Sequence, residues 1–145
     1  MKVALVQLNS QDDKSENIRK AFEYMDQAVL QKASVICLSE KFMYWGPDRS
    51  GTDINSQVIY DFQKYAKDNN VNIILGSIAL RVENSDNITN TCLVVDRNGE
   101  IVCRYDKIYM YTVDKPNLKI DEASDTVAGS KLGLVELESW YWYLL

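Results

Sequence analysis

The sequence predicts an α/β protein with a mixed sheet, and three observations lead to that prediction. In the first 80 residues, three short apolar segments alternate with two segments of helical periodicity. Two further apolar segments are joined through Asn98-Gly99, a strong signal for an antiparallel hairpin. A chain of 145 residues, 46% of them hydrophobic, is long enough for one domain with a buried core.

The first expected strand and helix occupy the first 32 residues. Val3 to Leu8 is partly β-branched and apolar on both faces, which is typical of a strand covered on both sides. Asp13, with Glu16 three residues later, predicts the N-cap of a helix that runs to about Lys32. The apolar side chains of this helix recur at steps of three and four residues: Ile18, Ala21, Phe22, Met25 and Val29.

The next elements continue the alternation. Ser34 to Leu38 is a second buried strand, and a loop rich in Gly, Pro and Asp spans Gly46 to Asp53. A second helix then presents four apolar side chains on one face: Val58, Phe62, Tyr65 and Ala66. Val71 to Leu80 is a third strand, which we expect to be broken by Gly76. This β-α-β-α-β order predicts right-handed parallel crossovers.

In the C-terminal hairpin region the alternation of strands and helices gives way to two strands joined by a short turn. Thr91 to Val95 and Ile101 to Tyr105 are two short strands on either side of the turn at Asn98-Gly99. They would add antiparallel strands to a parallel sheet, so the complete sheet is predicted to be mixed.

Composition excludes several classes of function. Lys and Arg total 16 against 21 for Asp and Glu, so the net charge of −5 disfavours nucleic acid as a partner. The absence of histidine excludes a Ser-His-Asp triad and a His-ligated zinc site. Cys37, Cys92 and Cys103 match no metal-binding spacing and indicate reduced thiols in a cytoplasmic protein. We expect no cofactor, no metal and no membrane span.

Two charged residues directly follow expected strands. Glu40 comes after the second strand, and Lys107 comes after the strand that ends at Tyr105. Ligands of open α/β sheets bind beyond the carboxyl ends of the strands. Each charge taken alone is most simply a solvated loop residue.

The flanks of these two residues give a family resemblance. Val3 to Asn9, Leu38-Ser39-Glu40 and Tyr105-Asp106-Lys107-Ile108 resemble the nitrilase superfamily, the carbon–nitrogen hydrolases. Tyr111 to Gly129 is similar to the omega-amidase and deaminated-glutathione-amidase branch. The resemblance implies that residues 1–136 form the N-terminal part of such a domain, a partial nitrilase-type α-β-β-α sandwich. It leaves residues 137–145 as an atypical aromatic tail.

The resemblance also implies a chemistry. The family hydrolyses small amides or nitriles with a Glu-Lys-Cys site, in which a cysteine attacks the substrate carbon and forms a thioester. By similarity Glu40 is the general base, Lys107 stabilises the oxyanion, and Glu122 is a second glutamate that orients the site. Family members often carry a histidine two residues after the lysine, a place that Tyr109 takes in this chain.

The nucleophile is missing from its expected place. The family pattern Gly-x-x-x-Cys-Tyr-Asp would begin near Gly133, but no cysteine occurs between Gly133 and the last residue. Cys37 lies three residues before Glu40, so a continuous strand turns the two side chains to opposite faces. Cys103 lies roughly 13 Å along a strand from Lys107, at about 3.3 Å per residue. We interpret all three cysteines as core residues and expect the chain to be inactive as an amidase.

The tail and the overall function each leave alternatives open. Trp140 to Leu145 is either an ordinary edge strand or an out-of-frame or truncated end that replaces the second half of the domain, and we favour the second interpretation. The alternative to an amidase lineage is a non-enzymatic remnant that binds a small ligand or an intact homologue. An incomplete sandwich would expose apolar strand faces, so self-association or a homo-oligomer is expected.

Overall fold

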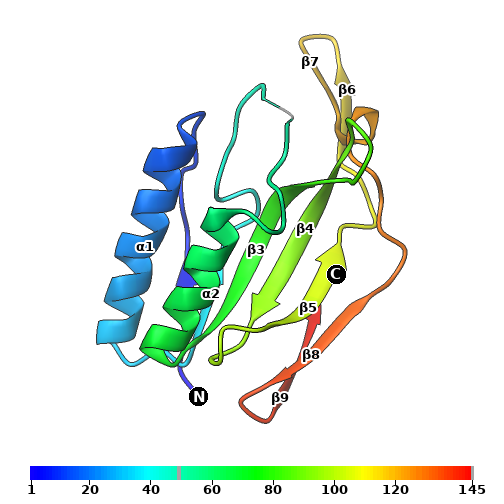
Figure 1. Ribbon diagram of the computed structural model, residues 1–145. Helices are drawn as coiled ribbons and strands as arrows, with labels where there is room; N and C mark the ends of the chain where they lie inside the picture. Colours follow the sequence, from blue (N-terminus) through cyan, green and yellow to red (C-terminus); the bar gives the residue numbers. More distant parts are fainter. Residues whose placement is uncertain (49, 145) are drawn as a thin grey trace.

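The computed structural model describes residues 1–48 and 50–144 and confirms the mixed α/β architecture (Figure 1). In chain order the elements are β1 (Val3–Val6), α1 (Lys14–Leu30), β2 (Val35–Leu38), α2 (Gln57–Asn69), β3 (Asn72–Arg81), β4 (Ile88–Val95), β5 (Ile101–Asp106), β6 (Thr112–Lys115), β7 (Leu118–Asp121), a 3-10 turn (Glu122–Ser124), β8 (Gly133–Leu137) and β9 (Trp140–Leu144). The main sheet has the order β1-β2-β3-β4-β5, and β6–β7 and β8–β9 form two separate hairpins.

The main sheet is parallel in its first half and antiparallel in its second, as predicted. β1, β2 and β3 pair in parallel, whereas β3, β4 and β5 pair antiparallel. The Asp13 side chain caps α1 by accepting a hydrogen bond of 3.0 Å from the Glu16 backbone N–H. The helix ends at Leu30, two residues before the expected end, because Lys32 adopts a left-handed φ of 62° that closes the last turn.

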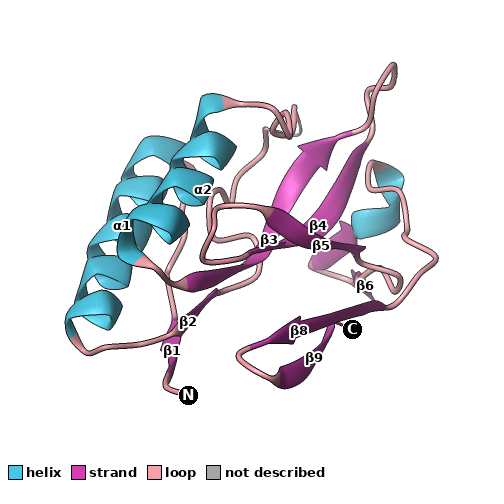
Figure 2. Ribbon diagram, turned by 60° about the horizontal axis from the view of Figure 1, so that its bottom comes forward, coloured by secondary structure: helices cyan, strands magenta, loops and turns pink. Residues whose placement is uncertain are grey.

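The two helices cover one face of the sheet (Figure 2). Their apolar side chains form the larger core with the sheet, and its aromatic centre is Phe62, which stacks on Phe22 at 4.7 Å and meets Phe42 edge-on at 5.6 Å. The opposite face, here called the far face, carries a second cluster that includes Val35, Ile74, Cys92, Val94 and Tyr105. Helices therefore cover one face of the sheet, and a hairpin covers part of the other.

The hairpin over the far face is β8–β9 (Figure 2). Val135 and Leu137 from β8 are buried in the far-face cluster, and Trp142 and Leu144 from β9 pack against it. The described part of the aromatic tail thus forms a paired strand. The cover is partial, because Leu5 in β1 is 81% exposed. That the tail is foreign to the domain stays a prediction.

Gly76 permits a close approach between two strands. β3 continues through Gly76, where we expected a break, and its register with β4 shifts between Leu75 and Ile78. A Cβ atom at Gly76 would lie 1.7 Å from the carbonyl oxygen of Leu38, a contact that no side chain can make. The end of β2, and with it Glu40, can lie this close to β3 only because residue 76 is glycine.

We predict that Gly76→Ala lowers the free energy of unfolding by about 3 kcal/mol, because the added methyl group forces β2 and β3 apart. Urea unfolding measures the change. Ala79→Gly, which also changes one methyl group in β3, is the matched control and should cost about 0.5 to 1 kcal/mol. A smaller loss for Gly76→Ala than for Ala79→Gly would contradict the steric argument.

Candidate active site

The ends of β2 and β5 bring the expected site residues to the same edge of the sheet. Glu40 follows β2, and Lys107 follows β5, which runs in the same direction. The backbone N–H of Lys107 donates to the carbonyl of Asn90 at 2.8 Å, which fixes the end of β5 against β4. Glu40 and Lys107 thus lie just beyond the ends of two strands whose pairing in the sheet fixes where these residues begin.

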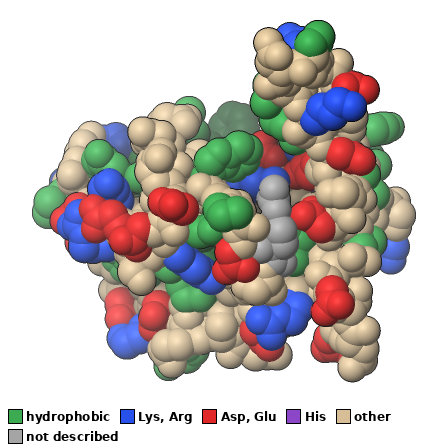
Figure 3. All heavy atoms as spheres, turned by 90° about the horizontal axis from the view of Figure 1, so that it is seen from above, with side chains coloured by type: hydrophobic (Ala, Val, Ile, Leu, Met, Phe, Trp, Pro, Cys, Tyr) green, Lys and Arg blue, Asp and Glu red, His purple; other side chains and the backbone are tan. Residues whose placement is uncertain are grey.

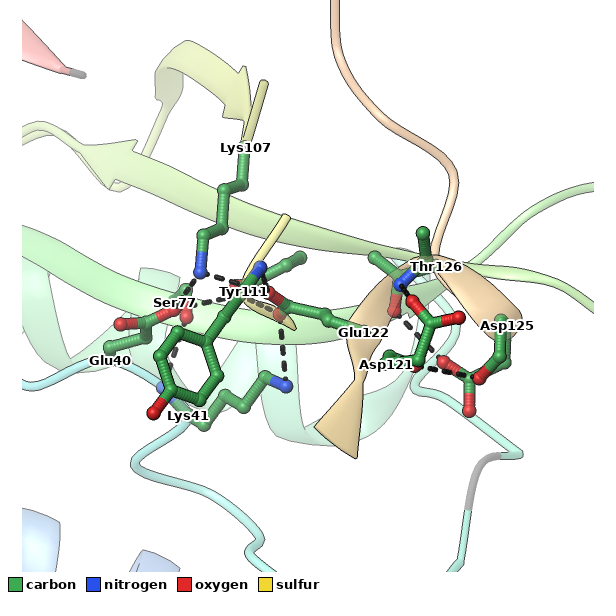
Figure 4. Close-up of polar contacts among 12 residues, drawn as sticks. Glu40, Lys41, Ser77, Lys107, Tyr111, Asp121, Glu122, Asp125 and Thr126 are labelled. Atoms are coloured by element: carbon green, nitrogen blue, oxygen red, sulfur yellow. Dashed lines mark hydrogen bonds and ion pairs between the residues drawn. The ribbon is translucent and has the colours of Figure 1, made fainter. Parts of the chain in front are cut away.

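Lys107 lies between the two glutamates (Figure 4). Its Nζ is 3.1 Å from Oε1 of Glu40 and 2.9 Å from Oε2 of Glu122. Burial works against the charge of Lys107, but its hydrogen bonds to Glu122 and Glu40 outweigh burial and raise the pKa of its ammonium. The resemblance implies that Glu40 and Lys107 belong to one site, and the structure brings their side chains into direct contact.

The Glu122 carboxylate is saturated with hydrogen-bond donors (Figure 4). Its Oε2 accepts from Lys107 and from the backbone N–H of Tyr111, both at 2.9 Å. Its Oε1 accepts from Asn90 at 2.9 Å and pairs with Lys41 at 3.1 Å. Burial opposes ionisation of this residue, which is 8% exposed, but the Tyr111 N–H and the three side-chain donors outweigh it. The pKa of Glu122 falls to about 2, so the carboxylate stays ionised at neutral pH.

Lys41 and Asn90 complete the site, and sequence reasoning missed both. Lys41 has a left-handed φ of 50°, and its backbone N–H donates to Ser77 at 3.0 Å. This backbone conformation directs a lysine directly after Glu40 toward Glu122 instead of toward solvent. Asn90 lies just before the strand that we had expected to begin at Thr91, although β4 begins at Ile88. The signal that could have identified it is an amide side chain between two threonines at the start of an otherwise apolar hairpin strand.

Gly129 holds the segment after Glu122 against the end of β5. Its backbone N–H donates to the Lys107 carbonyl at 2.8 Å. A Cβ atom at Gly129 would lie 2.0 Å from the carbonyl oxygen of Asp106. The glycine therefore allows residues 122–129 to pass close enough to β5 for Glu122 to reach Lys107.

A cavity of about 270 Å³ lies beside Glu40 and Lys107. Asn90, Cys92 and Leu144 contribute to its wall. Burial raises the pKa of Cys92 to about 12, so its thiol is protonated at neutral pH. Two further cavities, of about 590 and 830 Å³, adjoin Lys41 and Trp45. The acidic and basic residues of the site thus face space that a small molecule could fill.

All three cysteines are free thiols associated with the far-face cluster. Cys92 is buried within it, and Cys37 and Cys103 are half-buried against it. Burial raises the pKa of Cys37 to about 11 and also raises that of Cys103. The prediction that they are core residues is therefore confirmed for Cys92 alone, and it misses that Cys92 borders the cavity, whereas Cys37 and Cys103 are half-buried at the edge of the cluster.

The segment from Gly133, where the resemblance placed the nucleophile strand, leads away from the site. β8 starts next to Tyr105 and finishes near the start of β3, where Glu138 accepts a hydrogen bond of 2.8 Å from Asn72. The chain then reverses, and β9 returns to the cavity that Leu144 lines. The strand directed at Glu40 and Lys107 is thus β9, and the position of the family nucleophile in this chain stays a prediction.

The surroundings of the site have mixed charge. Acidic and basic side chains are interspersed over the end of the molecule where β2 and β5 finish (Figure 3). Among the described residues, no group of three or more Cys, Asp and Glu side chains is arranged to hold a metal ion. Within the described chain, neither helix has the length and apolar character needed to cross a membrane.

Fold and site together define an α/β protein with an ion-paired glutamate–lysine centre at the carboxyl ends of its strands. The chain belongs to the carbon–nitrogen hydrolase family, whose model matches residues 2–133. The deaminated glutathione amidase of Dictyostelium discoideum is 31% identical over 144 residues, which cover 90% of this chain and 50% of that protein. The omega-amidase of Homo sapiens is 26% identical over 132 residues, covering 88% of this chain and 47% of that protein.

Solved structures support the same fold. A Saccharomyces cerevisiae member of the nitrilase superfamily superimposes with a TM-score of 0.80 at 18% identity, covering 97% of this chain and 53% of that one. A cysteine-to-alanine variant of an amidase from Nesterenkonia, solved with butyramide, has a TM-score of 0.79 at 20% identity and covers 100% of this chain and 55% of that one. The chain spans about half the length of the curated relatives it matches.

The buried carboxylate sets a pH dependence of stability. Because the pKa of Glu122 is lowered on folding, its contribution to stability is present above the ordinary value near 4.5 and is lost as the pH falls toward about 2. Because the pKa of Lys107 is raised, its contribution is present below the ordinary value near 10.5 and is lost as the pH rises through its folded value.

We predict that Glu122→Gln lowers the free energy of unfolding by about 2 kcal/mol at neutral pH, because it removes the charge that compensates two lysines. The difference from the parent chain should shrink by about half near pH 3, where the parent also loses its contribution. Urea unfolding at several pH values measures both effects.

Glu16→Gln is the matched control for this experiment. A hydrogen bond from Arg19 also lowers the pKa of Glu16 to about 2, but Glu16 lies on the exposed surface of α1. Exposed ion pairs contribute little to stability, so the control should change it hardly at all. Equal losses in the two variants would contradict the special role of the buried site.

Proposed function

We propose that this chain carries the glutamate–lysine part of an amidase site for small amides. The observation that carries the proposal is the position of the Lys107 ammonium, held between Glu40 and Glu122 beside a cavity of about 270 Å³. A fixed cation of this kind stabilises the oxyanion that develops when an amide carbonyl is attacked. Relatives with amidase names, and one amidase solved with butyramide, support the substrate class.

In this proposal each charged residue has its own role. Glu40, whose side chain is 57% exposed, takes a proton from the attacking group and returns it to the leaving ammonia. Lys107 donates to the carbonyl oxygen as negative charge builds up on it. Glu122, already saturated by donors, takes no proton itself and keeps Lys107 charged and in place.

We further propose that this chain is inactive as an amidase, because it lacks a suitably placed thiol. A solved relative has an active-site cysteine that acrylamide alkylates. In this chain the side chain from β9 at the cavity is Leu144, and the only cysteine on the cavity wall is Cys92 among the described residues. Its high pKa makes Cys92 a poor nucleophile. The free thiols favour a reducing, cytoplasmic setting.

We predict no ammonia release from butyramide or glutamine above the buffer background, because loss of a nucleophile costs several orders of magnitude in rate. A coupled ammonia assay on the purified chain makes the measurement. Turnover that disappears in Cys92→Ser or Cys103→Ser would overturn the proposed inactivity and identify the thiol responsible.

Leu144→Cys tests the position of the site directly. A thiol at residue 144 would lie at the cavity beside Lys107, whose positive charge favours the thiolate. Acrylamide should alkylate it about tenfold faster than the thiol of Leu134→Cys, an exposed position on β8 outside the cavity, and mass spectrometry measures both rates. Equal rates would argue against a lysine-activated site.

A second candidate function is supported by the partly uncovered far face. Leu5 is 81% exposed on β1, an edge strand of the sheet, and edges beside apolar surface invite strand pairing. On this proposal the chain is a non-enzymatic unit that binds a second copy or an intact homologue through the β1 edge.

We predict that the chain self-associates and that Leu5→Lys weakens the association by about tenfold or more, because a charge at an exposed edge opposes pairing. Sedimentation velocity over a range of concentrations measures it. Leu30→Lys changes an equally exposed leucine, at the end of α1, and should have no effect. A monomer at every concentration would rule out this second function.

A further inference from the structure

Asn90 contacts both glutamates of the site with one amide nitrogen. Its Nδ2 donates to Oε1 of Glu40 and to Oε1 of Glu122, each at 2.9 Å. The residue is only 3% exposed and belongs to β4, whose eight residues are all buried. The two N–H groups of an amide nitrogen match this arrangement, since each can serve one carboxylate.

The contact leaves the two oxygens of Glu40 in different states. Oε1 accepts from both Asn90 and Lys107, whereas no hydrogen bond or ion pair from a described residue reaches Oε2. A carboxylate held through one oxygen keeps the lone pairs of the other available for a proton. The geometry therefore separates an anchored oxygen from a free one.

The orientation of the Asn90 amide leaves its own carbonyl oxygen without a hydrogen-bond donor from the described part of the chain. Its Oδ1 is buried and has no hydrogen-bond partner among the described residues. A buried acceptor without a partner costs about 1 to 3 kcal/mol. Rotating the amide would turn Oδ1 toward two carboxylates and take both donors away, so the observed orientation is the better of the two.

We propose that Asn90 is the positioning residue of this site: it anchors Oε1 of Glu40, so that Oε2 is the atom that exchanges protons. The assignment of Glu40 as the base rests on the proposed function, but the anchoring itself does not. Asn90 does this from a paired strand, whereas Glu40 lies in a loop and is exposed over more than half of its side chain. Without Asn90, Lys107 would be the single remaining anchor of Glu40 among the described residues.

Carbon-13 NMR of glutamate-labelled chain tests the proposal without any need for activity. Asn90→Leu retains the volume of the side chain and removes both donors, and Asn90→Ser restores one. Thr91→Val is the control, because Thr91 is equally buried on the same strand but donates to Asp106. The Glu122 carboxyl carbon reports its titration, with Glu40, Lys41 and Lys107 as its charged neighbours, and Glu40→Gln assigns the Glu40 signals.

In Asn90→Leu we expect the Glu122 titration midpoint to rise by about one pH unit, because a donor to the charged form is lost. We expect the two γ-methylene protons of Glu40, inequivalent when the side chain is fixed, to become equivalent as it rotates freely. Asn90→Ser should restore part of both effects, and Thr91→Val should show neither.

Unchanged Glu40 and Glu122 signals in a folded Asn90→Leu variant would overturn the inference, because packing alone would then be enough to hold the Glu40 side chain in place. Amide spectra check the fold of each variant. If Asn90→Leu does not fold, the signals of Asn90→Ser decide by the same criterion. If the NMR changes occur but Leu144→Cys is not alkylated faster than Leu134→Cys, the proposed function is wrong. The inference that Asn90 anchors Glu40 would still hold.

Discussion

The site depends on the hydrogen bonds and ion pairs that surround the buried carboxylate of Glu122. Its four donors come from the residue after Glu40, from β4, from the end of β5 and from the backbone of Tyr111. One buried anion therefore joins segments that are far apart in the sequence. A buried charge is stable only when its donors surround it, so these segments must pack in one arrangement.

Two glycines make that arrangement sterically possible. Gly76 allows the end of β2 to lie against β3, and Gly129 allows the chain after Glu122 to lie against β5. Each faces a backbone carbonyl at a distance at which no Cβ atom fits. The charged side chains of the site can therefore meet only because two pairs of backbone segments pack closely at these glycines.

Residues of the far face form one wall of the cavity beside Glu40 and Lys107. The β8–β9 hairpin covers part of it and brings Leu144 to the cavity beside Glu40 and Lys107. The same face carries Cys92, whose burial keeps its thiol protonated. The site thus combines a charged centre with an apolar wall, and the proposed inactivity rests on the absence of a reactive thiol from that wall among the described residues.

The sequence by itself determined which segments of the chain form the main-sheet strands and both helices, because their apolar periodicity and the Asn98-Gly99 turn are local signals. It also gave Glu40, Lys107 and Glu122 as candidates, through short motifs that resemble one family. Only the tertiary structure decided that Lys41 and Asn90 join them, that β3 passes unbroken through Gly76, and that β9 is the strand directed at the cavity. These features depend on a left-handed backbone at Lys41, an approach between backbones and the reversal of a hairpin, and such long-range contacts leave little trace in local sequence.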